Sequence, residues 1–256
     1  MNKIFKLFYI LKKEGLINTL KVIRRKLWAK LFQGKKGLEI GGPSNFFKQG
    51  DVLPIYPEIS SLDLVNFSAT TIWEGNLKEG ENSKFDKAQT SYQYIADAVD
   101  LSAIASENYD FVLSCHNLEH IANPFKAIKE WLRVLKLNGI LLLVLPKKAG
   151  NFDHKRPVTT IEHLRDDYEQ EIKEDDLSHL EEILEYHDLA RDLPAGGFEQ
   201  FKLRCLKNFE NRAMHHHVFD AKLLKAIYHY FKLKILFVSD TELDYIIAGR
   251  KPRSIS

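Results

Sequence analysis

Short apolar segments alternate with amphipathic helical segments between residues 36 and 146, and this alternation constrains the fold more than any other feature of the sequence. The clearest helical segment runs from Pro124 to Leu135 and carries its large apolar residues on one side. Strands separated by helices pair in parallel, because each helix carries the chain back across a face of the sheet. We therefore predict an α/β fold with strands at residues 36–40, 59–64, 91–96, 109–114 and 140–145.

Beyond Pro146 the regular alternation stops. Residues 161–192 hold thirteen acidic residues against three Lys or Arg, so we expect 147–219 to form a helical insertion that caps the substrate site. A helix at about 220–231 then precedes two β-rich segments, 232–238 and 244–249, which are typical of an antiparallel hairpin. We also expect Asn138-Gly139 to end the 124–135 helix, because glycine favours the position after a helix terminus.

The charge of the chain is unevenly distributed. Residues 1–36 carry eleven Lys or Arg and one acidic residue, for a net charge of +10, whereas the whole chain of 256 residues carries only +2. With 45% hydrophobic and 28% charged residues, the composition is that of a globular protein and excludes a disordered chain. We divide the chain into a basic amphipathic helical arm, residues 1–34, and one domain, residues 35–256.

Two interpretations of the arm stand side by side. Its apolar stripe either packs on the domain, or residues 1–33 contact an anionic membrane surface as a peripheral helix. Nucleic acid is not expected as a partner, because the rest of the chain is acidic and no recognition motif accompanies the basic residues. The stripe consists of Leu16, Leu20, Ile23, Leu27 and Leu31.

No targeting or membrane-spanning segment is apparent. The longest apolar runs fall short of the roughly 20 residues that a membrane helix needs, and Lys6 and Lys12-Lys13 interrupt the N-terminal apolar stretch. Cys115 and Cys205 lie 90 residues apart, without metal-ligand spacing. We expect a reduced, cytoplasmic protein, either free or peripheral to the inner face of the membrane.

A glycine pair, Gly41-Gly42, ends the first apolar strand. Glycine lets the backbone turn sharply and lets a ligand approach where a Cβ atom would collide. Open parallel sheets bind ligands at the carboxyl ends of their strands, so we expect a ligand here; an ordinary strand-to-loop turn is the alternative. The motif reads Gly37-Leu38-Glu39-Ile40-Gly41-Gly42-Pro43-Ser44.

Two further acidic positions follow in order. Asp63 lies at the expected end of the second strand, where a carboxylate accepts hydrogen bonds from ribose hydroxyls in nucleoside-binding sheets. A helix cap or a solvated turn is the alternative role for Asp63. Asp97 precedes the 109–114 strand and is suited to accept a hydrogen bond from an adenine amino group, with Ala98 leaving room for the ring.

Taken together, these motifs resemble class I S-adenosylmethionine-dependent methyltransferases of the methyltransferase-type-11-like group. The resemblance covers about residues 35–146 and implies a Rossmann-like three-layer sandwich, in which a seven-stranded, mostly parallel sheet ends in an antiparallel strand. One departure is that Pro43 and Ser44 replace later glycines of the family pattern. The motifs are Glu39 to Pro43, Asp63, Asp97-Ala98, the stretch Tyr109 to His120, Pro124 and Asn138-Gly139.

The resemblance implies S-adenosylmethionine as the cofactor. Glu39, Gly41 and Gly42 would line its methionine portion, Asp63 the ribose, and Asp97 and Ala98 the adenine. Ser114, Cys115 and His116 would line the reactive face. A dinucleotide-binding oxidoreductase is the weaker interpretation, because its Gly-x-Gly-x-x-Gly spacing is absent.

A hydroxyl acceptor would require a base, and histidine suits that role because it titrates near working pH. We rank His154 first, His217 second and His120 third. The segment 151–168 resembles methyltransferases of bacterial surface polysaccharide synthesis, so we expect O-methylation of a sugar or another small polar acceptor. A non-catalytic cofactor-binding or scaffold protein is the alternative function.

The run His215-His216-His217 raises the question of a metal ion. His215 and His217 with Asp153 could bind a divalent ion, but a run of three histidines is more often a partly solvated loop. We therefore expect no resident metal.

Overall fold

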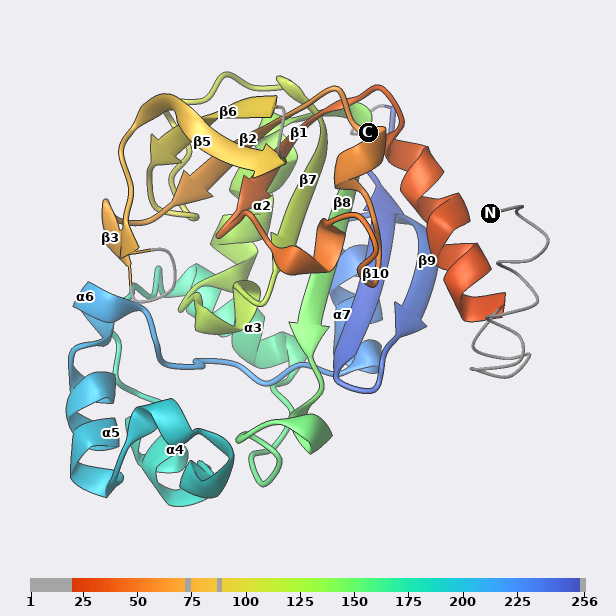
Figure 1. Cartoon of the computed structure of the whole chain (residues 1–256). Helices are drawn as coiled ribbons and strands as arrows, with labels where there is room; N and C mark the ends of the chain where they lie inside the picture. The colour runs from red at the N-terminus through yellow and green to blue at the C-terminus, as the bar shows by residue number, and fades with distance from the viewer. Residues whose placement is uncertain (1–19, 72–74, 87–88, 254–256) are drawn as a thin grey trace.

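A single eight-stranded sheet organises the molecule in this computed structural model, which describes residues 20–71, 75–86 and 89–253 (Figure 1). The chain order of the strands differs from their order in the sheet, which is β5-β6-β2-β1-β7-β8-β10-β9. The strands are β1 (Lys36–Ile40), β2 (Ser61–Asn66), β5 (Gly80–Asp86), β6 (Gln89–Ile95), β7 (Tyr109–Cys115), β8 (Leu135–Pro146), β9 (Lys234–Asp240) and β10 (Asp244–Arg250). A separate small hairpin pairs β3 (Thr70–Thr71) with β4 (Gly75–Asn76).

The central strands are parallel, and the strands near both edges introduce the antiparallel pairs. β6, β2, β1, β7 and β8 pair in parallel, whereas β10 pairs antiparallel with both β8 and β9. This arrangement confirms the predicted Rossmann-like fold with its terminal antiparallel hairpin. The seven expected strands are all present, and β5 adds an eighth by pairing antiparallel with β6 at the edge.

One face of the sheet is covered by α2 (Pro124–Val134), α3 (Ile161–Glu169) and α7 (Ala221–Tyr230) (Figure 1). The Asn123 side chain caps α2 by accepting a hydrogen bond from the Lys126 amide at 3.0 Å. Trp131 is fully buried under α2 and donates its Nε1 hydrogen to the carbonyl of Ala98 at 3.0 Å. Burial of this apolar helix face fixes α2 against β8 and α3.

The opposite face is covered by the N-terminal helix and by short 3-10 helices. Residues 20–29 are α-helical and continue into η1 (Lys30–Phe32). Trp28 stacks on Phe237 of β9 with ring centroids 4.2 Å apart, and Phe32 meets Phe111 of β7 edge to face. Between β1 and β2 the described chain forms only η2 (Asn45–Phe47) and η3 (Tyr56–Glu58). The third layer is therefore thinner than alternating strands and helices predict.

The arm packs through its C-terminal residues, which include only Leu31 of the described part of its predicted apolar stripe. Leu20, Ile23 and Leu27 are 52%, 37% and 63% exposed, whereas Ala29 and Phe32 are buried. Leu16 lies outside the described residues. The aromatic residues Trp28 and Phe32 bind the helix to the sheet, and this leaves Leu20, Ile23 and Leu27 open to solvent.

The segment between β8 and α7 is helical throughout its regular parts. It contains η5 (Lys148–Gly150), α3, α4 (Leu180–Tyr186), η6 (Leu189–Arg191), η7 (Leu193–Ala195), α5 (Phe198–Leu206) and α6 (Asn208–Asn211). Ile183, Ala195, Phe201, Cys205 and Met214 form a small core of its own. Figure 1 shows α4, α5 and α6 projecting beyond the carboxyl ends of the sheet strands.

Two predicted boundaries were wrong. Helix α2 ends at Val134 rather than at Asn138-Gly139, because Leu135 already pairs with Tyr109 as the first residue of β8. Asn138 adopts a left-handed conformation inside this strand, with φ of 61°. The second strand ends at Asn66, two residues later than expected.

The structure also bears on whether the chain crosses a membrane. Among the described residues, no helix combines the length and the apolar character that crossing a bilayer requires.

Candidate active site

A tight turn after β1 requires its two glycines. Gly41 has φ of 76°, and a Cβ atom there would lie 2.7 Å from the Asn117 side-chain nitrogen. A Cβ atom on Gly42 would lie 2.4 Å from the Glu39 carboxyl carbon. The turn therefore brings the backbone of β1 close to β7, as the glycine motif predicts.

Glu39 stabilises the turn by accepting two hydrogen bonds. Its side chain is fully buried; Oε2 accepts a hydrogen bond from the Tyr56 hydroxyl at 2.6 Å, and Oε1 accepts one from the Ser44 amide at 3.1 Å. Burial, together with the negative charge of Glu39, raises the pKa of Tyr56 and keeps its hydroxyl protonated. Pro43 and Ser44, which replace family glycines, lie on the wall of the cleft that the turn borders.

That cleft has a volume of about 1030 Å³ and lies at the carboxyl ends of the central strands. One wall comes from the strand ends and the other from the insertion and the start of β10. Its strand-end residues include Gly41, Asn66, Phe67, Ala98, Cys115, His116 and Asn117; its other wall includes Phe152, Asp192, Arg204, Arg212, His215 and Asp244.

The predicted cofactor residues divide into two groups. Gly41, Ala98, Cys115 and His116 line the cleft, whereas Glu39, Gly42, Asp97 and Ser114 are not among its lining residues. Burial, and then the charges of Glu39 and Glu119, raise the pKa of the Cys115 thiol, which disfavours its reactive thiolate form. Asp97 accepts a hydrogen bond from the Arg212 guanidinium at 3.0 Å. Asp97 thus positions a cation that does line the cleft.

Asp63 lies inside β2 rather than at its end. Its carboxylate accepts hydrogen bonds from the Tyr109 hydroxyl at 2.8 Å and from the Tyr92 amide at 3.3 Å. The residue at the carboxyl end of β2 is Asn66, which lines the cleft and donates to the Gly42 carbonyl at 3.1 Å. Sequence analysis missed Asn66 because it ended the strand too early; extending the apolar run through Val65 would have found it.

His116 and Asp244 form a hydrogen-bonded pair in the cleft. His116 follows directly after β7 with φ of 49°, and its Nε2 lies 2.7 Å from Oδ1 of Asp244. The Thr241 hydroxyl donates to the second oxygen of Asp244 at 2.6 Å, which fixes the carboxylate. Burial alone would lower the pKa of His116, but this hydrogen bond and the charges of Glu119 and Asp244 outweigh burial and raise it.

A second polar group lies deeper in the cleft. His215 donates from Nδ1 to Asp153 at 2.5 Å, and its ring meets the edge of the His120 ring at 4.4 Å. Although burial opposes ionisation of Asp153, the charges of His215 and Arg156 hold its pKa at about 2. Burial raises the pKa of the nearby Glu119. This group joins the turn after β7 to the insertion.

The three predicted bases occupy different surroundings. His154 pairs with Asp188 at 2.8 Å within the insertion and does not line the cleft. His217 is buried and contacts Asp167 at 2.9 Å, whereas His215 contacts Asp153. His120 lines the cleft but is enclosed, and burial lowers its pKa well below the usual value. The structure thus draws attention to His116, which sequence analysis placed on the reactive face and did not rank among the bases.

Comparison with known proteins gives one family match. Residues 56–143 match the model of a family described as a methyltransferase domain. A search of curated proteins found no significant match.

The chain also resembles solved methyltransferase structures. For the N-methyltransferase NodS from Bradyrhizobium japonicum, identity is 12%, coverage is 91% of this chain and 93% of that chain, and the TM-score is 0.46. A SAM-dependent methyltransferase from Methanosarcina mazei is 16% identical, with coverage of 89% of this chain and 97% of that chain and a TM-score of 0.48. The trans-methyltransferase CalH, solved in complex with SAH, is 14% identical, with coverage of 96% of this chain and 62% of that chain and a TM-score of 0.44.

The domain match and the strand order define the class of this protein. It is an S-adenosylmethionine-dependent methyltransferase, which confirms the predicted enzyme class and cofactor. The residues present fit the cofactor: the glycine turn leaves no Cβ atom at the cleft's edge, and Asn66 and Ala98 follow at the next strand ends. A methyl acceptor is therefore implied.

Proposed function

We propose that this enzyme methylates a hydroxyl group of a sugar or another small polar acceptor, with His116 as the base. The observation that carries the proposal is the His116–Asp244 pair, which lies in the cleft beside the glycine turn. When bound, S-adenosylmethionine supplies an electrophilic methyl group on its sulfonium. The acceptor oxygen forms the new bond to carbon as the carbon–sulfur bond breaks, and the hydroxyl proton passes to His116.

The hydrogen bond to Asp244 determines which nitrogen of His116 can act. A carboxylate only accepts hydrogen bonds, so Nε2 of His116 carries the hydrogen that it donates to Asp244. In the neutral ring Nδ1 is then the unprotonated nitrogen that can take a proton. Asp244 thus acts as a positioning residue, because it selects the tautomer and stabilises the charged ring after proton transfer.

The charges of the cleft favour an uncharged acceptor. Its two lining guanidiniums are already paired: Arg204 with Asp192 at 2.6 Å, and Arg212 with Asp97 at 3.0 Å and with Glu174 at 3.1 Å. A phosphorylated acceptor would need cations that are not neutralised in this way. The segment 151–168, whose sequence resembles enzymes of surface polysaccharide synthesis, contributes Phe152 to this wall. These features support a glycan hydroxyl as the acceptor.

The test is methyl transfer to isolated glycans. We expect the wild type to transfer labelled methyl from S-adenosylmethionine to a glycan fraction, with a mass gain of one CH₂ on the product. His116→Gln should lower kcat by roughly 10²–10⁴-fold while binding S-adenosylhomocysteine normally. His229→Gln, on the exposed face of α7, is the control. Full activity of His116→Gln would refute the assignment of the base, and transfer only to nitrogen atoms would refute O-methylation.

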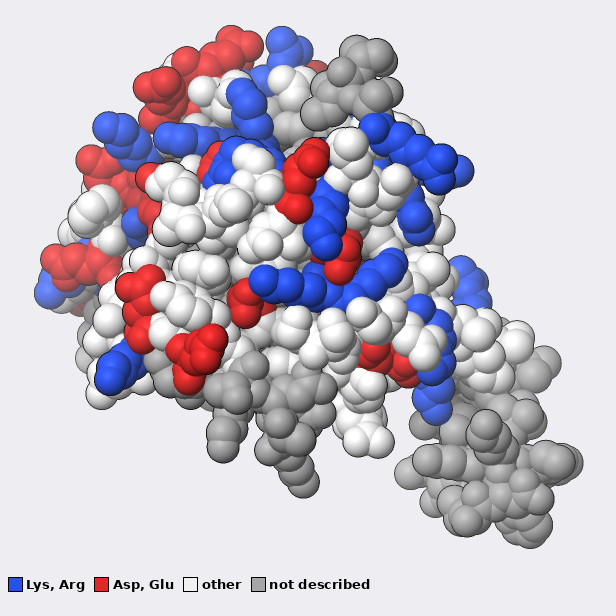
Figure 2. Space-filling model, turned by 90° about the horizontal axis from the view of Figure 1, so that it is seen from above, with Lys and Arg blue, Asp and Glu red and all other residues white. Residues whose placement is uncertain are grey.

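We also propose that the arm contacts an anionic membrane surface. The exposed Leu20, Ile23 and Leu27 lie on the same helix as the exposed Lys21, Arg24 and Lys26. Figure 2 shows Lys and Arg prevailing on the side of the molecule that carries this helix, and Asp and Glu on the opposite side. Apolar residues flanked by cations are the features that hold a helix at a lipid interface.

A further inference from the structure

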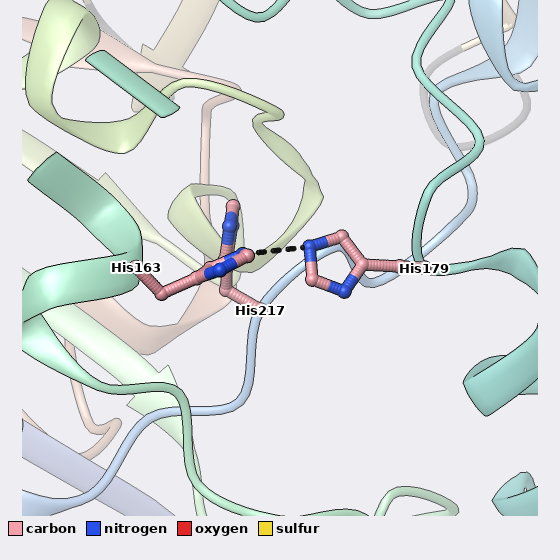
Figure 3. A group of neighbouring side chains, drawn as sticks. All are labelled: His163, His179 and His217. Atoms are coloured by element: carbon pink, nitrogen blue, oxygen red, sulfur yellow. Dashed lines mark hydrogen bonds between the residues drawn. The ribbon is translucent and has the colours of Figure 1, made fainter. Parts of the chain in front are cut away.

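Three histidines from separate segments of the 147–219 insertion lie close together. His163 lies on α3, His179 precedes α4, and His217 lies on the segment before α7. Figure 3 shows their rings directed toward one another, and one ligand atom from each lies within 4.8 Å of the other two. Nε2 of His163 lies 3.0 Å from Nε2 of His179. In a tetrahedral zinc site with bonds of about 2.0–2.1 Å, neighbouring ligand atoms are about 3.3 Å apart.

Both ring nitrogens of His217 face hydrogen-bond acceptors: Nδ1 faces the Ile121 carbonyl and Nε2 faces the Asp167 carboxylate. Nδ1 of His217 lies 3.2 Å from the Ile121 carbonyl, which only accepts, so Nδ1 carries a hydrogen. In the neutral ring Nε2 then has a lone pair, yet it lies 2.9 Å from the Asp167 carboxylate, another acceptor. A cation between the two would turn this repulsion into attraction.

Burial disfavours a charged imidazole at His217. His217 is 1% exposed and Asp167 is 7% exposed. Neutral imidazoles with free Nε2 atoms are the form that binds metal ions.

We propose that His163, His179 and His217 bind a divalent transition-metal ion, Zn²⁺ being the best fit, with Asp167 as the neighbouring carboxylate. Imidazole ligands select zinc and its transition-metal neighbours rather than Mg²⁺ or Ca²⁺, which prefer oxygen. A histidine that binds a metal through one ring nitrogen is commonly oriented by a hydrogen bond from the other. The hydrogen bond from Nδ1 of His217 to the Ile121 carbonyl has this role. This site departs from our expectation of no resident metal, and it does not depend on the proposed acceptor.

The ion would join three segments of the 147–219 insertion to one another. His163 and Asp167 are one turn apart on α3, and His179 lies 16 residues further along the insertion. The His217 amide lies 3.4 Å from the Glu119 carbonyl, next to the turn after β7 that borders the cleft. A bound metal would therefore hold three segments together beside the acceptor wall.

Metal content and binding of the full chain test the site. After dialysis against a chelator, we expect the wild type to bind one Zn²⁺ per chain and to gain thermal stability on its addition. Co²⁺ in its place should give the visible absorption of a four-coordinate site. His163→Gln and His179→Gln, both at partly exposed positions, should lose the Co²⁺ bands and weaken Zn²⁺ binding at least 100-fold while remaining folded by circular dichroism.

Two controls keep the proposal falsifiable. His215→Gln alters the neighbouring group of Glu119, His120 and His215, which also brings ligand atoms within 4.8 Å of one another. His154→Gln alters a histidine outside both groups. Both variants should keep one Zn²⁺. Loss of the metal in His215→Gln with retention in His163→Gln, or no stoichiometric Zn²⁺ in the wild type, would overturn the proposal.

Discussion

At the scale of single residues, the site depends on side chains that hold other groups in place. Glu39 fixes the glycine turn through Tyr56 and Ser44, and Asp97 holds Arg212. Sequence motifs singled out both carboxylates as cofactor-lining residues, whereas in the structure they hold neighbouring groups and are not among the residues that line the cleft. The pair of His116 with Asp244 could not be predicted, because it joins residues 128 positions apart and depends on how the last strand inserts into the sheet.

Removing Asp244 should change the pH dependence of the reaction. His116 must be neutral to accept a proton, so kcat should rise with pH through the raised pKa of His116. Asp244→Asn removes the charge that helps to raise this pKa, so the acidic limb should move to lower pH. The plateau should fall because the amide no longer selects the tautomer. A pH–rate profile of both proteins measures this, and an unmoved limb would contradict the role of Asp244.

Adding a methyl group at Gly42 should weaken cofactor binding. In Gly42→Ala the new Cβ atom would lie 2.4 Å from the Glu39 carboxyl carbon, whose oxygens are held by Tyr56 and Ser44. Relief of such crowding costs about 1–3 kcal/mol, so S-adenosylhomocysteine should bind about 5- to 150-fold more weakly by calorimetry. Gly197→Ala, whose Cβ atom meets nothing closer than 4.0 Å, should bind normally. Equal affinities would show that the turn tolerates a side chain.

At the scale of elements, the sequence predicted the strands more accurately than the segments that cover the sheet. Buried runs such as Phe111 to Cys115 are apolar enough to predict a central strand. The arm was harder to predict, because its leucine stripe and its aromatic residues each suggest a packing face. Stacking of Trp28 on Phe237 decides between them, and a single sequence does not show that contact.

Exposed leucines on the arm should affect membrane binding but not folding. Changing Leu20, Ile23 and Leu27 to Ser removes apolar area that is already largely exposed, so the melting temperature should stay nearly constant. Flotation with vesicles containing phosphatidylglycerol should fall, because insertion depends on that apolar area. Neutral phosphatidylcholine vesicles serve as the control. Equal flotation of variant and wild type would end the membrane proposal.

At the scale of the whole molecule, the insertion and the sheet domain share a network of charges. Glu174 accepts a hydrogen bond from the Ala122 amide at 3.0 Å and pairs with Arg212, which also binds Asp97. The acidity of residues 161–192 predicted a helical insertion. It did not predict that Glu174 turns inward, because this residue lies in the turn-rich segment between α3 and α4, where no helical periodicity indicates a buried side.

Glu174 should make stability depend on pH. Burial raises its pKa to about 7 against the opposing charge of Arg212. The folded protein therefore holds this proton more tightly than the unfolded chain, and the resulting stability, complete at low pH, is lost as pH rises toward and through 7. Glu174→Gln has no such proton. Its free energy of unfolding, relative to wild type, should rise by up to about 3 kcal/mol between pH 4.5 and 8, as denaturant titrations can measure. If the free energies of unfolding of Glu174→Gln and wild type changed in parallel with pH, Glu174 would not be the source of the pH dependence.

The position of β10 in the sheet has a consequence for how the enzyme is made. β10 follows every other described strand in the chain, yet it inserts between β8 and β9. A ribosome delivers residues from the N-terminus onward, so the glycine turn and His116 emerge more than a hundred residues before Asp244. The growing polypeptide can form a cofactor-binding half while its proposed base still lacks a partner. Chemistry would thus begin only after synthesis has passed the final hairpin.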